Sequence, residues 1–110
     1  MSIWTNICKV ADILPNSGRA ALFNGKQVAI FRVRQADQET FYALGNYCPF
    51  SHANVISRGI VGSIGESTVV ASPVYKQHFC LETGRCLEDE QQTLATWKVQ
   101  VVGDTVQLAV

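Results

Sequence analysis

The sequence predicts an all-β domain, with a small antiparallel sandwich or barrel as its base and a small β subdomain inserted at about residues 46–87. Three observations support this fold. Short runs rich in β-branched and aromatic residues recur along the chain, turn residues separate them, and no stretch has the length and 3.6-residue period of an ordinary helix. The 110 residues are expected to form a single domain, and 47% hydrophobic against 16% charged residues is typical of a globular chain.

The first 45 residues predict a meander of antiparallel strands. Residues 3–10 alternate loosely, and residues 11–18 form a connection that Pro15 and Gly18 punctuate. Strands at 19–23 and 26–34 flank Asn24-Gly25, a strong hairpin signal, because both central residues of a type I′ turn need positive φ. A further strand is expected at 40–44.

The strand at 26–34 has the clearest two-residue period, which assigns its side chains to two faces. One face carries Val28, Ile30 and Arg32, and the other carries Ala29, Phe31 and Val33.

The second half of the chain begins with a long loop and then returns to strands. Residues 45–62 show no strand alternation and can form at most one helical turn, at 53–57. Short strands are expected at 60–64 and 68–71 around Gly65-Glu66. A small hairpin is expected from 77–81 and 85–87, and a last hairpin from 97–102 and 105–110 around Gly103-Asp104.

Charge and composition exclude several classes of protein. Nine basic and nine acidic residues with no basic run make nucleic acid an unsuitable partner. No apolar run approaches the roughly 18 residues of a membrane span, and residues 1–5 lack the features of a leader, so we expect a cytoplasmic protein with no membrane contact. In that reducing compartment, the four cysteines are expected to be free thiols or ligands.

Two proline-bearing turns, Cys48-Pro49-Phe50 and Ser72-Pro73-Val74-Tyr75, are expected to meet in space. They have the outline of an iron–sulfur site with Cys-x-His on one loop and Cys-x-x-His on the other, in which two thiolates and two imidazoles hold a [2Fe–2S] cluster. The same offsets here carry Cys48, Phe50, Ser72 and Tyr75. A phenyl ring has no lone pair and a hydroxyl is a poor ligand for this iron, so we interpret these as former ligand positions. We expect no metal, cofactor or catalytic residue in this chain.

The order of elements resembles the Rieske domain, whose cluster-binding subdomain is inserted between strands of a β base, and residues 81–87 resemble the turn after its second ligand loop. Within that superfamily, five runs together resemble the small subunits of the cytoplasmic NAD(P)H-dependent nitrite reductases. These runs are Asp12-Ile13-Leu14-Pro15, Gly25-Lys26-Gln27-Val28-Ala29-Ile30-Phe31, Pro49-Phe50-Ser51, Ser57-Arg58-Gly59-Ile60-Val61-Gly62 and Ala71-Ser72-Pro73-Val74-Tyr75-Lys76-Gln77.

This resemblance implies a non-catalytic subunit with a Rieske-like fold and no cluster ligands. The large partner subunit of that family carries FAD, a [4Fe–4S] cluster and sirohaem, and reduces nitrite to ammonium. We therefore expect this chain to dock on such a large subunit, to stabilise it or shape its redox sites, and to be inactive alone. The family commonly has Asp-Pro-Phe where this chain has Cys48-Pro49-Phe50, which leaves a redox or metal role for Cys48 open.

The residues predicted to contact the partner lie at or beside the two turns: Phe50, Arg58, Val74, Tyr75 and Lys76. Aromatic side chains at loop tips suit an interface and a small core equally, so Phe50 and Tyr75 can instead cap the core of the subdomain. Arg58 and Lys76 can instead be solvated surface charges.

Three other functions compete with this interpretation. Cys48, His52, His78 and Cys80 could form a zinc site in a binding module, although burial of Phe79 would turn His78 and Cys80 outward. A Rieske-type [2Fe–2S] ferredoxin that carries electrons is the second, and a free-standing regulatory or scaffolding domain is the third. A disulfide between Cys80 and Cys86, which flank a tight hairpin, is a further possibility that a reducing compartment disfavours.

Overall fold

The computed structural model describes residues 3–73 and 76–109, and it is built almost entirely of β-strands. None of the helices in this described part is long and apolar enough to cross a membrane. The elements are β1 (Trp4–Lys9), η1 (Val10–Asp12), β2 (Ser17–Phe23), β3 (Lys26–Gln35), β4 (Gln38–Gly45), β5 (Tyr47–Cys48), β6 (Ala53–Asn54), η2 (Ile56–Arg58), β7 (Ile60–Ile64), β8 (Ser67–Ala71), β9 (His78–Cys80), β10 (Thr96–Val102) and β11 (Thr105–Ala109). The prediction that the described chain is all-β is confirmed.

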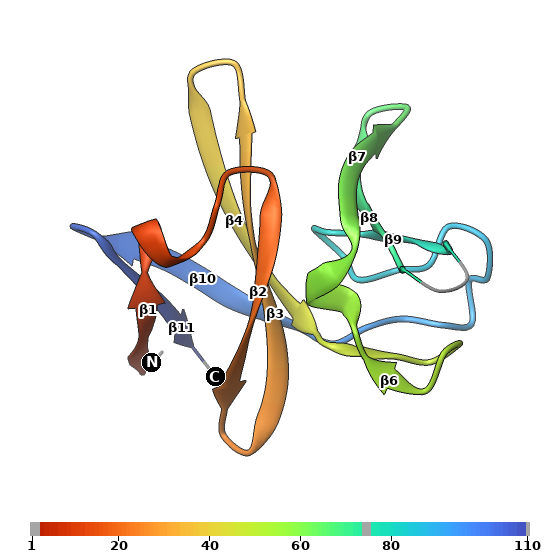
Figure 1. Ribbon diagram of the computed structural model, residues 1–110, viewed down its shortest axis with the longest axis horizontal. Helices are drawn as coiled ribbons and strands as arrows, with labels where there is room; N and C mark the ends of the chain where they lie inside the picture. Colours follow the sequence, from red (N-terminus) through yellow and green to blue (C-terminus); the bar gives the residue numbers. More distant parts are fainter. Residues whose placement is uncertain (1–2, 74–75, 110) are drawn as a thin grey trace.

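The base is a curled six-stranded antiparallel sheet in the order β1-β11-β10-β4-β3-β2. It joins the two ends of the sequence, because β1 pairs with β11. Its narrowest junction is between β4 and β10, where only Leu44 and Ala43 face Thr96 and Trp97. In Figure 1 the base occupies the left side, and β1 and β2 are its two edge strands.

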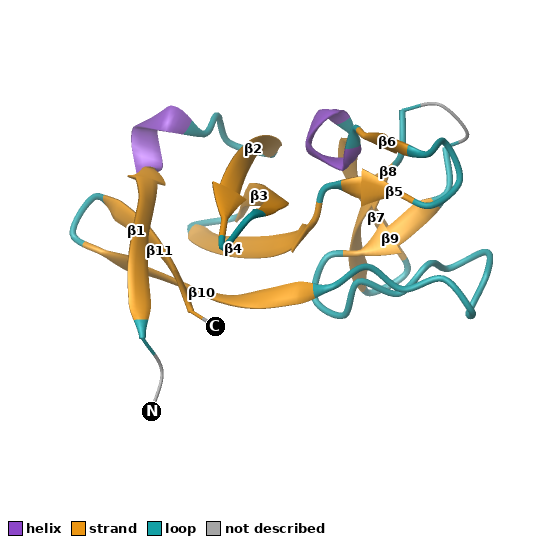
Figure 2. Ribbon diagram, turned by 90° about the horizontal axis from the view of Figure 1, so that it is seen from below, coloured by secondary structure: helices purple, strands orange, loops and turns teal. Residues whose placement is uncertain are grey.

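Strands β5 to β9 lie between β4 and β10 in the sequence and pair only with one another. They form a two-stranded sheet, β5–β6, and a three-stranded sheet, β7-β8-β9. Figures 1 and 2 show both small sheets on the same side of the base, with η2 next to them. We refer to residues 46–87 as the insert, and the interpretation of the insert as a former cluster-binding subdomain stays a prediction.

Strand β3 supplies both hydrophobic cores, so the predicted alternation at 26–34 is confirmed. Val28 and Ile30 belong to the core inside the curled base. Ala29, Phe31 and Val33 belong to a second core, which reaches into the insert. Residues Val28 to Phe31 are completely inaccessible to solvent, so each face of β3 is covered by a different core.

The predicted type I′ hairpin is also confirmed, with φ values of 51° at Asn24 and 76° at Gly25. Two strands are longer than expected. β2 begins at Ser17 because Gly18 pairs with Phe31, and β4 begins at Gln38 because Ala36 adopts a φ of 54° and allows a tight turn.

The predicted loop at 45–62 contains the two-residue strands β5 and β6 as well as η2. Of the predicted hairpin at 77–81 and 85–87, only the first arm forms a regular strand, β9, which pairs with β8. The second arm makes isolated bridges from Cys86 to Phe79 and from Arg85 to Thr93. Each of these pairings involves only two or three residues, too few to produce a strand alternation in the sequence.

Candidate functional site

The two proline-bearing turns meet, as predicted, through a direct contact between Cys48 and Ser72. Cys48 ends β5 and Ser72 follows β8. A hydrogen bond of 3.2 Å joins the Cys48 Sγ and Ser72 Oγ atoms, and the two residues are 0% and 1% exposed. The strands that lead to these turns belong to separate small sheets, so packing of the sheets brings the turns together rather than pairing of their strands.

The environment of Cys48 lowers the pKa of its thiol but shields the sulfur from solvent. Burial, the largest single effect, raises the pKa of the thiol, but the hydroxyls of Ser51 and Ser72 and the backbone N–H groups of Ser51 and Phe50 together bring it below its ordinary value. The buried Ser51 Oγ has no hydrogen-bond partner of good geometry. Of the two hydroxyls, Ser72 is therefore the one whose hydrogen bond to Cys48 supports the lowered pKa. A shielded thiol without an adjacent base is not arranged for nucleophilic chemistry.

The remaining predicted positions are distributed between the core and the surface. Phe50 is half-buried against the second core, the one that reaches into the insert, and its ring centroid lies 6.1 Å from that of Phe79. Arg58, in η2, and Lys76 are exposed. Val74 and Tyr75, predicted as contact residues and in the case of Tyr75 as a former ligand position, lie outside the described residues.

The four residues of the possible zinc site make other contacts. The exposed His52 ring hydrogen-bonds the hydroxyl of Tyr47 at 3.2 Å, and His78 Nδ1 lies 2.7 Å from a carboxylate oxygen of Glu88. Within residues 3–73 and 76–109, no three His, Cys, Asp or Glu side chains are grouped so that they could hold a metal ion.

Cys80 and Cys86 are both free thiols in this structure and occupy different environments. Cys86 bridges to Phe79, and both side chains are completely buried. Cys80 is the next residue in β9, so its side chain points to the opposite face, where it is partly exposed. This geometry does not suit a disulfide between them.

The ion pair between His78 and Glu88 predicts an acid-sensitive contribution to stability. Burial raises the pKa of Glu88, but the backbone N–H, the ring and the charge of His78 together lower it. A carboxylate with a depressed folded-state pKa stabilises the fold above its unfolded pKa, and this contribution is lost as the pH falls through the folded value. We expect Glu88→Gln to be less stable than the wild type at pH 7, by at most about 1 kcal/mol because the pair is partly exposed. Thermal unfolding between pH 7 and pH 3 should show the two curves converging in acid.

Glu90→Gln is the matched control for that experiment, since Glu90 is exposed and makes no ion pair with a described residue. Its difference from the wild type should stay small at every pH. A difference between Glu88→Gln and wild type that does not narrow toward pH 3 would contradict the proposed role of the pair.

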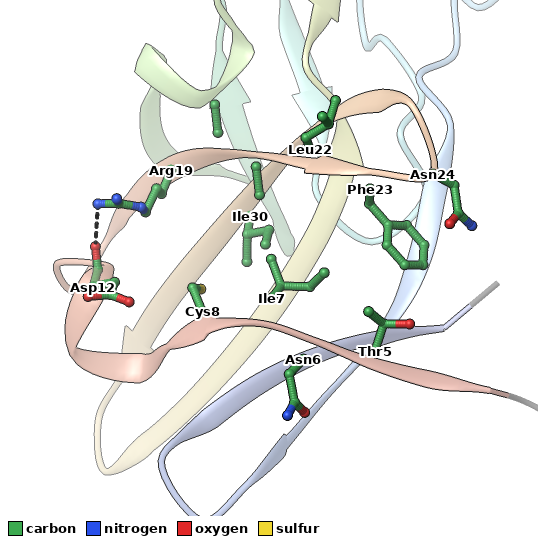
Figure 3. A pocket seen from close by; sticks show the side chains of 12 residues that line it. Thr5, Asn6, Ile7, Cys8, Asp12, Arg19, Leu22, Phe23, Asn24 and Ile30 are labelled. Atoms are coloured by element: carbon green, nitrogen blue, oxygen red, sulfur yellow. Dashed lines mark hydrogen bonds between the residues drawn. The ribbon is translucent and has the colours of Figure 1, made fainter.

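A cavity of about 480 Å³ opens in the base between the edge strands β1 and β2 (Figure 3). A register shift between Asn6 and Cys8 interrupts the pairing of β1 with β11 beside it. Arg19, on the rim, donates a hydrogen bond of 3.3 Å to the backbone oxygen of Asp12. Burial and the Asp12 charge raise the pKa of the Cys8 thiol, although Arg19 opposes this, so this environment does not activate the thiol as a nucleophile.

Comparisons with known proteins agree with this geometry. Residues 3–109 match the family described as Rieske-like [2Fe-2S] domain. The chain is 46% identical over 108 residues to the nitrite reductase (NADH) small subunit of Salmonella typhimurium, with 98% of each chain covered. The structure described as a putative NADH-dependent nitrite reductase small subunit from Mycobacterium tuberculosis is 38% identical, with a TM-score of 0.90, and covers 100% of this chain and 96% of that chain.

The chain belongs to the Rieske-like family of nitrite reductase small subunits. The resemblance seen in the sequence is therefore confirmed. A further relative is a large subunit and is more informative about assembly. A nitrite reductase [NAD(P)H] large subunit of Klebsiella oxytoca contains a stretch 40% identical to this chain, which covers 89% of this chain but only 10% of that protein. In that relative, a small-subunit-like domain is part of the large polypeptide.

The fold of the small-subunit family also occurs in electron carriers. A ferredoxin of carbazole 1,9a-dioxygenase from Nocardioides aromaticivorans has a TM-score of 0.77 at 21% identity, and covers 96% of this chain and 95% of that one. At this identity the likeness establishes the shared fold alone.

The residues of this small-subunit chain do not fit the [2Fe–2S] cluster that gives the wider Rieske-like family its description. A cluster would have to lie between the two loops, but Cys48 Sγ and Ser72 Oγ are already in direct contact, 3.2 Å apart. Phe50 has no lone pair, and its ring packs on the insert core. The described side chains at the predicted ligand positions thus leave no room for a cluster between Cys48 and Ser72.

Sequence reasoning missed Asn46, which joins the base of the small subunit to its insert. Asn46 is 1% exposed, and its side chain donates hydrogen bonds to Gln27 Oε1 at 3.2 Å and to the backbone oxygen of Asn54 at 3.3 Å. Its Oδ1 accepts the backbone N–H of Ser57 at 2.8 Å. An asparagine after a strand is common in turns, so no local signal separated this buried position from an exposed one.

Proposed function

We propose that this chain is the non-catalytic small subunit of a cytoplasmic NAD(P)H-dependent nitrite reductase, and that it docks on the large subunit to stabilise it or shape its redox sites. The Klebsiella oxytoca relative carries this proposal, because there a similar domain belongs to the large-subunit polypeptide itself. Two domains that occur in one chain in one organism commonly associate as separate chains in another. The closed contact between Cys48 and Ser72 supports a role without a cluster.

The chemistry of the reaction then belongs to the partner. The resemblance implies that FAD, a [4Fe–4S] cluster and sirohaem lie on the large subunit, where electrons from NAD(P)H reduce nitrite to ammonium. This chain contributes a surface that binds the large subunit. Isolated, it should show no nitrite-dependent oxidation of NAD(P)H.

We place the docking surface at the tips of the former ligand loops and on η2. Phe50, Arg58 and Lys76 are its described members, and we retain Val74 and Tyr75 in it from the sequence. Figure 2 shows η2, which carries Arg58, on the same side of the insert as β5 and β6. Arg58 and Lys76 make no ion pair with a described residue, so both charges are available to a partner. Exposed cations beside a partly exposed aromatic ring suit an acidic patch with an apolar centre.

The proposal is tested by expressing the large subunit with and without this chain. We expect co-purification, and nitrite-dependent NAD(P)H oxidation that is higher or longer-lived when both chains are present. Iron and acid-labile sulfide are measured on the small chain prepared alone. Stoichiometric iron and sulfide there would instead establish the ferredoxin function, and failure of the two chains to associate would overturn the docking role.

The docking surface is tested by the double charge reversal Arg58→Glu with Lys76→Glu. We expect the Kd for the purified large subunit to rise about tenfold or more at low salt, because two attractive charges become repulsive. Salt should reduce the difference through screening. Arg85→Glu with Lys98→Glu is the matched control, since both of these residues are exposed and lie outside the proposed surface. Equal affinities for the two double variants would exclude this surface.

A further inference from the structure

A groove of about 400 Å³ lies between the base and the insert, next to the first former ligand loop. It is lined by the β2–β3 hairpin, by β5 and the residue that follows its end, and by the segment that leads into β10. Pro49, which stands between Cys48 and Phe50, forms part of its wall. One wall residue of the groove, Pro49, is therefore the sequence neighbour of Phe50, a member of the docking surface proposed above.

The groove offers aromatic and aliphatic surface to an incoming side chain. Leu94 is 7% exposed, and Trp97 packs partly against the core of the base. The indole N–H of Trp97 makes no hydrogen bond with any residue that the structure describes. Tyr47 is 49% exposed although its hydroxyl is bonded to His52. Concave sites that combine aromatic surface with a free donor are typical binding pockets.

The charge of the groove selects the kind of group that it can bind. Lys26 is the one charged residue among the described residues that line the groove. The Lys26 side chain is exposed and forms no ion pair within the described part of the chain. Asn46 also lines the groove, but its side-chain amide already donates to Gln27 and Asn54 and accepts from Ser57. A single free cation beside apolar surface is complementary to one carboxylate next to an apolar side chain.

We propose, on the basis of the function proposed above, that the groove binds an extended segment of the large subunit that carries an aromatic or aliphatic side chain beside a carboxylate. The apolar side chain packs between Trp97 and Tyr47, and the carboxylate pairs with Lys26. A single partner chain that contacts Phe50 can also reach this groove, because Pro49, the preceding residue, lines it. A nucleic acid does not suit the site, since one lysine is too few cations for a phosphate backbone.

The first test measures the Kd of the purified, cofactor-loaded large subunit for three variants. Lys26→Glu reverses the charge in the groove, and Tyr47→Ala removes an exposed anchor. Lys98→Glu makes the same charge change on β10, outside the groove. We expect the first two to raise the Kd about tenfold, and Lys98→Glu to change it less than twofold. Wild-type affinity for both Lys26→Glu and Tyr47→Ala would overturn the assignment.

Hydroxyl-radical footprinting of the wild-type complex gives a second, mutation-free readout. Oxidation of Tyr47 and Trp97 should fall when the large subunit is added, whereas oxidation of Trp4, on the edge strand β1, should not change. If Tyr47 and Trp97 are oxidised equally with and without the large subunit, while Arg58 and Lys76 still contribute to its affinity, the proposed role of the groove is wrong and the docking surface stands. Absence of any complex would overturn both the groove and the proposed function, so the two failures are distinguishable.

Discussion

The Gly84→Ala variant is expected to unfold with a free energy about 2–5 kcal/mol lower than that of the wild type. Gly84 has a φ of +78°, which costs a residue with a Cβ about 1–2 kcal/mol. A Cβ at this position would also overlap the carbonyl oxygen of Leu94 and approach Thr96 Cγ2. The overlap forces the segment before β10 away from the insert, at a further cost of about 1–3 kcal/mol. Chemical denaturation monitored by circular dichroism measures the difference.

Gly65→Ala provides the matched control. Gly65 also has a positive φ, of +61°, but a Cβ there would have no neighbour within 4 Å. This variant should therefore lose about 1 kcal/mol, from backbone strain alone. Equal losses for the two variants would show that the contact of Gly84 with Leu94 does not hold the segment in place.

The Asn46→Ala variant is expected to lose about 2–4 kcal/mol of unfolding free energy and to loosen the insert before the base unfolds. Truncation leaves the backbone N–H of Ser57 without its acceptor and removes the two hydrogen bonds that the amide donates. An unsatisfied buried donor costs about 1–3 kcal/mol, and the vacated volume adds to this. Hydrogen exchange should show faster exchange at Ile56 and Ser57 than in the wild type, with β3 unchanged.

Asn54→Ala is the control for this second experiment. Asn54 is exposed, and it reaches Asn46 through its backbone oxygen, which the substitution retains. Its stability should stay within about 0.5 kcal/mol of the wild type. Unchanged exchange at Ile56 and Ser57 in Asn46→Ala would mean that the insert is held by its apolar core and not by this amide.

Part of the candidate site could be predicted from the sequence and part could not. The spacing of the two turns predicted that Cys48 and Ser72 lie at one site, as former ligand positions, and the structure brings the two side chains into contact. That they touch directly, and so close the site, could not be predicted, because it depends on how β5–β6 packs against β7-β8-β9. For Phe50, the core and interface alternatives were equal in the sequence. The structure places its ring near Phe79 but leaves part of it exposed, so its contact with a partner stays a prediction.

The sequence by itself determined the features that depend on one residue or one short run. Asn24-Gly25 determined the hairpin turn, because few residues adopt positive φ. The alternation around Ile30 and Phe31 determined two buried faces, because side chains along a strand have a period of two. Only the tertiary structure decided the pairing of β1 with β11, the narrow junction of β4 with β10 and the role of Asn46. These contacts join segments far apart in the chain, and their stability comes from the summed packing of both cores, which no single run of residues encodes.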